Sequence, residues 1–302
     1  MAEFKKILLT GIQGQVGQSL QQPLSGLGEV VGLDRQQLDL ADRDEIRRVI
    51  REVRPDLIVH PAAYTAVDRA EAETDLAFAI NAVAPGIIAE EASRLGAMLV
   101  HYSTDYVYDG RKDAPYVESD PANPLSVYGK SKLMGEDAIR AVGLPHLILR
   151  TSWVYGPYGK NFMKTIIRLA TERDGLRVVA DQFGAPTSSL SIAEATAAMI
   201  LRWQAGLSGT YHLTNGGCTS WHGFAQAILA SYEALRADKG WPVLRVKPDD
   251  VVAIPTADYP TPAARPATGS WPHGPTSLGR PGSPPRRRGS RRRRSRGDPP
   301  GR

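Results

Sequence analysis

Cysteine is nearly absent from this sequence: Cys218 is the only one in 302 residues. A lone thiol excludes an internal disulfide, and without a second cysteine nearby no zinc site forms, so we expect no bound metal. The sequence also lacks an uninterrupted run of about 20 apolar residues, the length that a membrane helix needs, so no membrane partner is predicted. The first apolar strand begins too early to leave room for a cleavable leader, which favours a cytoplasmic protein.

Acidic residues are almost absent from the end of the chain. Residues 268–302 hold ten arginines and one aspartate, whereas residues 1–267 carry a net charge of −4. Because this Arg/Gly/Pro/Ser-rich segment has little apolar surface, we predict a disordered tail over 268–302. Basic tails can bind nucleic acid or anionic membranes by counterion release, but no aromatic or groove-shaped element accompanies this arginine run. We therefore expect no nucleic-acid partner.

Strand and helix patterns alternate along the first half of the chain, whose overall composition is that of an ordinary globular protein. Four expected strands are continuously apolar, as in a parallel sheet covered by helices on both faces: 4–10, 30–34, 56–60 and 97–103. Helices are expected at 18–28, 42–54, 75–95 and 128–142. This alternation predicts an α/β fold with a Rossmann-type, doubly wound parallel sheet.

Proline and glycine become denser after Gly156, and the spacing of the elements loosens. We therefore expect a dinucleotide-binding Rossmann domain over residues 1–155 and a smaller C-terminal substrate-binding lobe mainly over 156–267. The remaining expected elements are strands at 146–150 and 177–179 and helices at 161–171, 191–203 and 219–235.

Three glycines, Gly11, Gly14 and Gly17, directly follow the first strand and precede a helix. Glycines in this position let the backbone turn tightly and approach a pyrophosphate, which lies at the helix N-terminus. Asp34 closes the second strand, where a carboxylate can bind an adenosine ribose, and this context favours dinucleotide binding over a structural turn. The neighbouring Arg35 can instead pair with a 2′-phosphate, so the cofactor is NADH or NADPH.

A second pattern combines a phenol, an ammonium and a hydroxyl. Tyr128 and Lys132 are four residues apart on an expected helix, so they share one face. A cation close to a phenol lowers its pKa towards the working pH of a general acid. The spacing alone also occurs on many surface helices, but Ser103 and Thr104 end a strand, where α/β folds gather ligands. A hydroxyl there can bind a ketone oxygen that Tyr128 protonates.

The glycine motif, the Tyr128/Lys132 pair and the upstream hydroxyl together resemble the extended short-chain dehydrogenases/reductases. Five segments resemble more narrowly the dTDP-4-dehydrorhamnose reductase family: 14–17 (GQVG), 62–68 (AAYTAVD), 101–107 (HYSTDYV), 150–156 (RTSWVYG) and 181–187 (DQFGAPT). The resemblance extends from about residue 4 to Pro266.

The resemblance implies reduction of the C4 ketone of dTDP-4-dehydro-beta-L-rhamnose to dTDP-L-rhamnose, a precursor of cell-surface polysaccharide, by NADPH or NADH. Tyr128 would donate the proton, Thr104 would tune the carbonyl, and Lys132 would hold the nicotinamide ribose and lower the pKa of Tyr128. The implied substrate residues are Thr104, Asp105 and Trp153. Together with the glycine motif, the implied cofactor residues are Gly11, Ile12, Gln13, Gly14, Val16, Gly17, Asp34, Asp39, Leu40, Ala63, Tyr64, Thr65, Tyr128 and Lys132.

Three residues have two interpretations each. The indole of Trp153 offers a flat wall for a sugar ring, or it belongs to the core. Arg265 contacts a substrate diphosphate, or it only caps the lobe. His60 stands where members of the family usually have asparagine, and we assign it no role.

Other functions remain open to a chain with these motifs. A dehydratase of the same superfamily would place Asp and Glu after the threonine, whereas Tyr106 follows Asp105 here. The alternatives are another nucleotide-sugar epimerase or reductase of the same superfamily, or a non-catalytic NADP-binding regulatory subunit. For the reductase, the expected partner is a dTDP-sugar substrate. We expect a monomer or a homodimer. The family pattern stops near Ala267, and we hypothesise that the tail is a GC-rich coding sequence read in the wrong frame.

Overall fold

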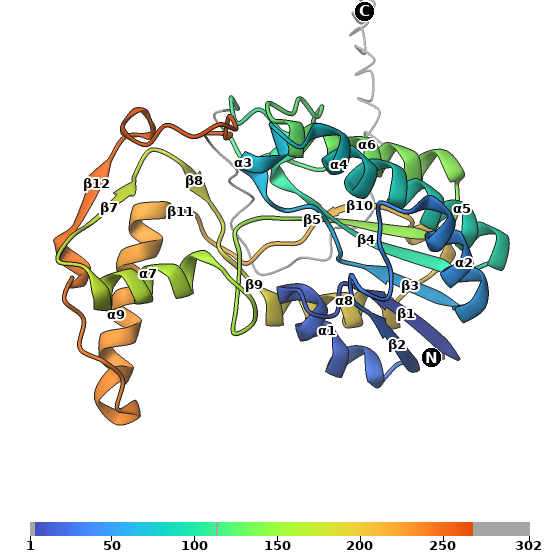
Figure 1. The fold of residues 1–302 in the computed structure, drawn as a ribbon, viewed down its shortest axis with the longest axis horizontal. Coiled ribbons are helices and arrows are strands. Elements are labelled where there is room, and N and C mark those ends of the chain that lie inside the picture. The colour runs from blue at the N-terminus through green and yellow to red at the C-terminus, as the bar shows by residue number, and fades with distance from the viewer. Residues whose placement is uncertain (1–3, 113, 268–302) are drawn as a thin grey trace, which may run out of the picture.

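A computed structural model describes residues 4–112 and 114–267, so the expected tail at 268–302 lies outside the described residues. A parallel sheet of six strands forms its centre, in the order β2-β1-β3-β4-β5-β10 (Figure 1). These strands are β1 (Lys6–Thr10), β2 (Glu29–Leu33), β3 (Leu57–His60), β4 (Met98–Thr104), β5 (His146–Thr151) and β10 (Gly209–His212). The predicted doubly wound α/β fold is confirmed.

The chain reverses direction across the sheet next to β1. From β1 it winds outward to β2, which pairs with it from Lys6↔Glu29 onward, and then crosses back to β3 on the other side of β1. In open α/β sheets, ligands bind at the carboxyl ends of the strands at such a reversal, because the connecting loops diverge there. The topology therefore places a crevice at the ends of β1 and β3.

Helices cover both faces of the sheet (Figure 1). One layer consists of α1 (Gln15–Ser25) and α8 (Ser189–Leu201), and the other of α2 (Arg43–Val53), α5 (Ala84–Leu95) and α6 (Val127–Val142). Neighbouring residues of β1 alternate between them: Ile7 and Leu9 pack with the first layer and Leu8 with the second. Both cores are buried and apolar, so burial of these strand side chains contributes most of the stability of the sheet.

Helix α6, which carries Tyr128 and Lys132, has defined ends. The Ser126 side chain accepts a hydrogen bond from the N–H of Gly129, which satisfies a free donor of the first turn. Gly143 ends the helix in the left-handed conformation (φ 73°), which glycine adopts without strain. These two caps define where α6 begins and ends.

One helix differs from the expectation that no segment is apolar enough to cross a membrane. The continuous helix Thr74–Leu95, formed by α4 (Thr74–Phe78), η1 (Ala79–Val83) and α5, is long and apolar enough by length and composition. Charged residues interrupt this helix, so it contains no long apolar run, but its many alanines raise its mean hydropathy. Of its apolar window, 61% is buried inside the protein, so it is a core helix.

The chain crosses the expected boundary at residue 155 and later returns. Helix α8 packs against α1, and β10 adds the sixth strand beside β5, although both follow residue 156. Residues 156–188 and 214–267 form most of the smaller lobe. Its elements are α7 (Phe162–Glu172), β7 (Leu176–Val179), β8 (Phe183–Gly184), β11 (Thr219–Ser220), α9 (Trp221–Lys239) and β12 (Val251–Ile254).

The remaining elements join the two parts or are short. β6 (Val154–Tyr155) pairs with β9 (Thr187–Ser188) where the chain leaves and re-enters the sheet domain. In the lobe, β7 pairs with β12, and α7 and α9 bury an aromatic cluster between them. The short helices are α3 (Val67–Ala70), η2 (Asp105–Val107), η3 (Ala205–Leu207), η4 (Pro248–Asp250) and η5 (Thr256–Asp258).

Candidate active site

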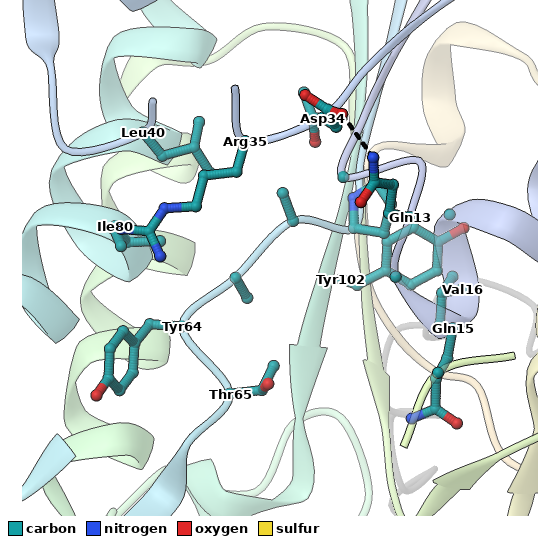
Figure 2. A pocket seen from close by; sticks show the side chains of 18 of the residues that line it. Gln13, Gln15, Val16, Asp34, Arg35, Leu40, Tyr64, Thr65, Ile80 and Tyr102 are labelled. Atoms are coloured by element: carbon teal, nitrogen blue, oxygen red, sulfur yellow. Dashed lines mark hydrogen bonds between the residues drawn. The ribbon is translucent and has the colours of Figure 1, made fainter. Parts of the chain in front are cut away.

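A cavity of about 540 Å³ opens at the reversal point of the sheet. It is lined by the loops that follow β1, β2 and β3 and by Tyr102 of β4 (Figure 2). Side chains of β5 and α6 complete the lining. The cavity brings together these predicted cofactor residues: Gly11, Gln13, Gly14, Val16, Gly17, Asp34, Asp39, Leu40, Ala63, Tyr64, Thr65, Tyr128 and Lys132. Ile12 is an exception, because its side chain packs against Gly32 of β2 and does not line the cavity.

The glycine loop leaves no space for side chains. Gly11 has φ +61°, and a Cβ atom on it would lie 2.9 Å from the Cβ of Ala62. A Cβ on Gly17 would lie 2.1 Å from the carbonyl oxygen of Gly11, so α1 begins in direct contact with the end of β1. The close approach needs glycine at both positions.

The N-terminus of α1 presents free N–H groups to the cavity. Its N-cap is Gly14, no side chain caps the first turn, and the first turn contains no acidic residue. Unsatisfied N–H groups at a helix N-terminus carry a partial positive charge and favour a bound anion. The loop and this helix end thus fit the diphosphate of a dinucleotide.

Asp34 and Arg35 lie at the far end of the cavity and point apart (Figure 2). The Asp34 carboxylate accepts a hydrogen bond from the Gln13 amide (2.6 Å) and two from the backbone N–H groups of Gln36 and Gln37 (2.8 and 3.2 Å). The exposed Arg35 extends past Leu40 instead. No carboxylate of residues 4–112 or 114–267 lies within ion-pair distance of its guanidinium.

A residue missed by the sequence analysis fixes the opposite wall. The Asn81 side chain accepts from the N–H of Tyr64 (2.8 Å) and donates to the carbonyl of Tyr64 (3.0 Å) and to the Ser131 hydroxyl on α6 (3.1 Å). It lies in η1, a π-helical turn, and such turns are frequent at functional sites. No spacing in the sequence distinguishes this turn from ordinary helix, so the signal appears only in the structure.

Other lining residues were also missed. Gln15, Tyr102 and Thr151 lie within the motif segments but were not assigned to the site, whereas Gly159 and Lys160 lie outside those segments. Gly159 closes over Gln15 with φ +62°, which places the connection after β6 beside the start of α1. Lys160 adds a cation to the side of the cavity that the free N–H groups of α1 face.

The Tyr128 hydroxyl lies beside Thr104 and Asp105. Burial raises the pKa of Tyr128 to about 12, the hydrogen bond with Thr104 opposes this shift, and the carboxyl of Asp105 adds to it. Thr104 also donates to Asp105 (3.1 Å), and burial raises the pKa of that carboxyl to about 7. The structure therefore brings together the predicted proton donor and the predicted carbonyl-binding hydroxyl.

The pKa of Tyr128 is raised in this structure, so the expected effect of Lys132 on it stays a prediction. The groups that set the pKa of this phenol are its burial, Thr104 and Asp105. Lys132 is 2% exposed, and its Nζ lies 3.1 Å from His101 Nε2 on β4. Burial lowers the pKa of Lys132 to about 8, and the charge of Glu136 opposes this shift.

The remaining predicted substrate residue, Trp153, lies at the lobe, as does Arg265, which had two interpretations. Trp153 has φ 46° and stacks on Trp221 at 3.5 Å between ring centroids, and Gly184 packs against the indole so closely that a Cβ there would lie 2.5 Å from it. Trp153 thus joins the core of the lobe at its edge. Arg265 forms an ion pair with Asp68 of α3 (2.9 Å), which joins the end of the lobe to the sheet domain.

Comparison with known proteins agrees with this architecture. A family model described as the RmlD substrate binding domain matches residues 5–271. The dTDP-4-dehydrorhamnose reductase of Burkholderia thailandensis is 48% identical over 268 residues, which are 87% of this chain and 88% of that protein. The enzyme of the same name from Escherichia coli K12 is 44% identical over 266 residues, 86% of this chain and 87% of that protein.

A solved structure shows the same fold. The crystal structure of dTDP-4-dehydrorhamnose reductase from Bacillus anthracis, in complex with NADP, superposes with a TM-score of 0.79 at 36% identity and covers 89% of this chain and 91% of that one. With its glycine loop, its Tyr128/Lys132 helix and these relatives, the chain belongs to the dTDP-4-dehydrorhamnose reductase family.

Proposed function

We propose that the protein reduces the C4 ketone of dTDP-4-dehydro-beta-L-rhamnose to dTDP-L-rhamnose with NADPH or NADH. The observation that carries the proposal is the position of Tyr128, which lines a cavity that fits a dinucleotide and whose hydroxyl is hydrogen-bonded to Thr104. Relatives that are 48% and 44% identical and are named dTDP-4-dehydrorhamnose reductase support the choice of substrate.

The residues of the cavity fit NAD(P)H. The uncapped N-terminus of α1 binds the diphosphate, and Lys160 adds a positive charge nearby. Asp34 and Arg35 face the adenosine end, and Lys132 and Tyr128 face the nicotinamide end, where the bound cofactor supplies a hydride. The relative of known structure that binds NADP supports this assignment.

Tyr128 is the proton donor. Because the pKa of its phenol is about 12, Oη keeps its proton at neutral pH and can transfer it to the ketone oxygen as hydride arrives at C4. Thr104, at the end of β4, binds the same ketone oxygen and orients it. After transfer the phenolate needs a cation, and Lys132, one helical turn further along α6, provides it.

The finer parts of this function rest on the family. We infer a dTDP-sugar as the ligand of the lobe, with Asp105 and Trp153 beside it, a cytoplasmic location, and a monomer or homodimer. An exchange of Arg265 between Asp68 and a substrate diphosphate is compatible with its position, because its partner Asp68 is itself partly exposed. The alternative of a regulatory subunit predicts cofactor binding without turnover.

The test is a reductase assay with dTDP-4-dehydrorhamnose and either cofactor, on the wild type and on Tyr128→Phe. We expect the wild type to oxidise NAD(P)H and the variant to lose about 10²-fold or more in kcat, because the general acid is removed. Tyr158→Phe, which removes an exposed phenol outside the cavity lining, is the control. Unchanged turnover in Tyr128→Phe requires another donor, and cofactor binding with no turnover in the wild type contradicts the proposal.

A further inference from the structure

Two histidines are buried side by side behind the active-site lysine. His60 on β3 and His101 on β4 are paired residues of neighbouring strands, and both are 0% exposed. Their rings stack with 5.3 Å between centroids and 25° between planes. His60 Nδ1 lies 2.8 Å from the Thr10 hydroxyl, at the end of β1. The reaction derived above uses neither histidine.

His101 joins this pair to the active site. Its Nε2 lies 3.1 Å from Lys132 Nζ. An ammonium can only donate hydrogen bonds, so Nε2 is the acceptor and the ring carries its hydrogen on Nδ1. That Nδ1 has no hydrogen-bond partner within the described part of the chain. Buried polar atoms rarely lack a partner, so His101 keeps one donor unpaired in the tautomer that serves Lys132.

The surroundings of Lys132 make this acceptor important. The titratable and charged groups around it are Tyr128 and Glu136 on α6, His101 on β4, His60 on β3 and, through Glu136, Arg140 on α6 and Arg150 on β5. Glu136 is the anion among them, and Arg150 binds its carboxylate (2.6 Å). Burial and the charge of Lys132 hold the pKa of His101 well below its ordinary value, so the ring stays neutral and can accept.

We propose that His101 is a positioning residue for this reductase: its Nε2 accepts a hydrogen bond from Lys132 and holds the ammonium, in its charged form, against the cofactor cavity. The inference rests on the proposed function for its catalytic consequence. With one N–H directed to His101, the other two N–H groups of Lys132 remain for acceptors in the cavity. Without that acceptor the buried ammonium loses a hydrogen-bond partner and gives up its proton more readily.

The first experiment follows Lys132 itself, in the protein without cofactor. The chain has nine lysines, so the signals of isotope-labelled lysine side chains can be assigned by substitution and titrated by NMR. In the wild type we expect Lys132 to titrate near pH 8. In His101→Leu its midpoint falls by about one pH unit or more, because the hydrogen bond from the ammonium is lost and only the charge of Glu136 still opposes burial. In His101→Gln, which keeps an acceptor, it stays near the wild-type value.

The second experiment measures kcat/KM against pH in the same variants. The basic limb reports the loss of the Lys132 proton, so His101→Leu moves this limb to lower pH and His101→Gln restores it. The control is His146→Leu, which removes a buried histidine at the start of β5 whose Nδ1 bonds the carbonyl of Leu144. It loses a buried hydrogen bond as well, but it leaves both Lys132 and the pH profile unchanged.

A folded His101→Leu protein with a wild-type Lys132 titration overturns the inference, as does a His101→Gln protein with the same shift as His101→Leu. If His101→Leu does not fold, His101→Met takes its place, because an unbranched thioether fills the site without a nitrogen or oxygen acceptor. If the wild type shows no reductase activity, the proposed function fails, and the titration of Lys132 still decides whether His101 holds it.

Discussion

At the scale of single residues, the contacts of Asp34 and Arg35 bear on the choice between NADPH and NADH. The Asp34 carboxylate already accepts three hydrogen bonds from the protein, the shortest from Gln13 at 2.6 Å. Arg35 lines the same cavity, is exposed, and forms no ion pair with any residue that the structure describes. The guanidinium of Arg35 is therefore available for a 2′-phosphate, whereas the carboxylate of Asp34 is less available for a ribose hydroxyl.

This arrangement predicts a preference for NADPH that depends on Arg35. In Arg35→Gln we expect KM for NADPH to rise about tenfold, the size of one charge-assisted contact, with little change for NADH. Arg202→Gln, which alters another exposed arginine outside the cavity, is the matched control. The measurement is a pair of cofactor saturation curves for each protein. Equal changes for both cofactors would contradict the assignment of Arg35 to the 2′-phosphate.

At the scale of elements, the junction of β1 and α1 is where backbone contact controls binding. In Gly17→Ala the new Cβ would lie 2.1 Å from the carbonyl oxygen of Gly11, so α1 must move away from the strand. We expect at least tenfold weaker NAD(P)H binding and a loss of about 1–3 kcal/mol in the free energy of unfolding. Gly175→Ala, where a Cβ would meet nothing within 4 Å, is the control. Calorimetric titration and urea unfolding test both effects.

Local patterns predicted most elements because each strand of the sheet interior is a continuous apolar run and each helix has a marked end. The expected helix 42–54 corresponds to α2 with its N-cap Asp42 and its left-handed C-cap Arg54, and the expected helix 75–95 ends at Leu95 of α5, with Gly96 as its C-cap. Strand β10 was not predicted, because an edge strand of four residues with half-buried side chains has no long apolar run. The hydrogen bond between Lys132 and His101 was not predicted either, because it joins residues 31 positions apart on different elements.

At the scale of the whole molecule, two neutral histidines, on β3 and β10 of the sheet, couple stability to acid. Burial lowers the pKa of His60 to about 3, and burial and Arg150 lower that of His212 to about 3. The unfolded chain binds protons at these histidines below about pH 6.5, whereas the folded chain does not until about pH 3. The free energy of unfolding therefore falls as the pH drops through this window and is retained above it.

His60→Asn tests this coupling by removing one such group while keeping an amide that can bond the Thr10 hydroxyl. Between pH 6.5 and pH 4.5 we expect the variant to lose about 2 kcal/mol less of its free energy of unfolding than the wild type, at ~1.4 kcal/mol per pH unit for one proton. Urea unfolding at the two pH values measures it. Equal losses in the two proteins would show that His60 is not the source.

The return of the chain into the sheet has a consequence for its synthesis. Strand β5 pairs with β10 at its outer edge, and α1 packs against α8. Both partners follow α7, β7 and β8 of the lobe in the sequence. As the chain leaves the ribosome, the edge of β5 and the apolar face of α1 therefore remain uncovered until residue 212 has emerged. A fragment ending near residue 155 would lack both partners and would keep this strand edge and this helix face exposed. We therefore expect that the nucleotide-binding half of this protein does not fold stably by itself.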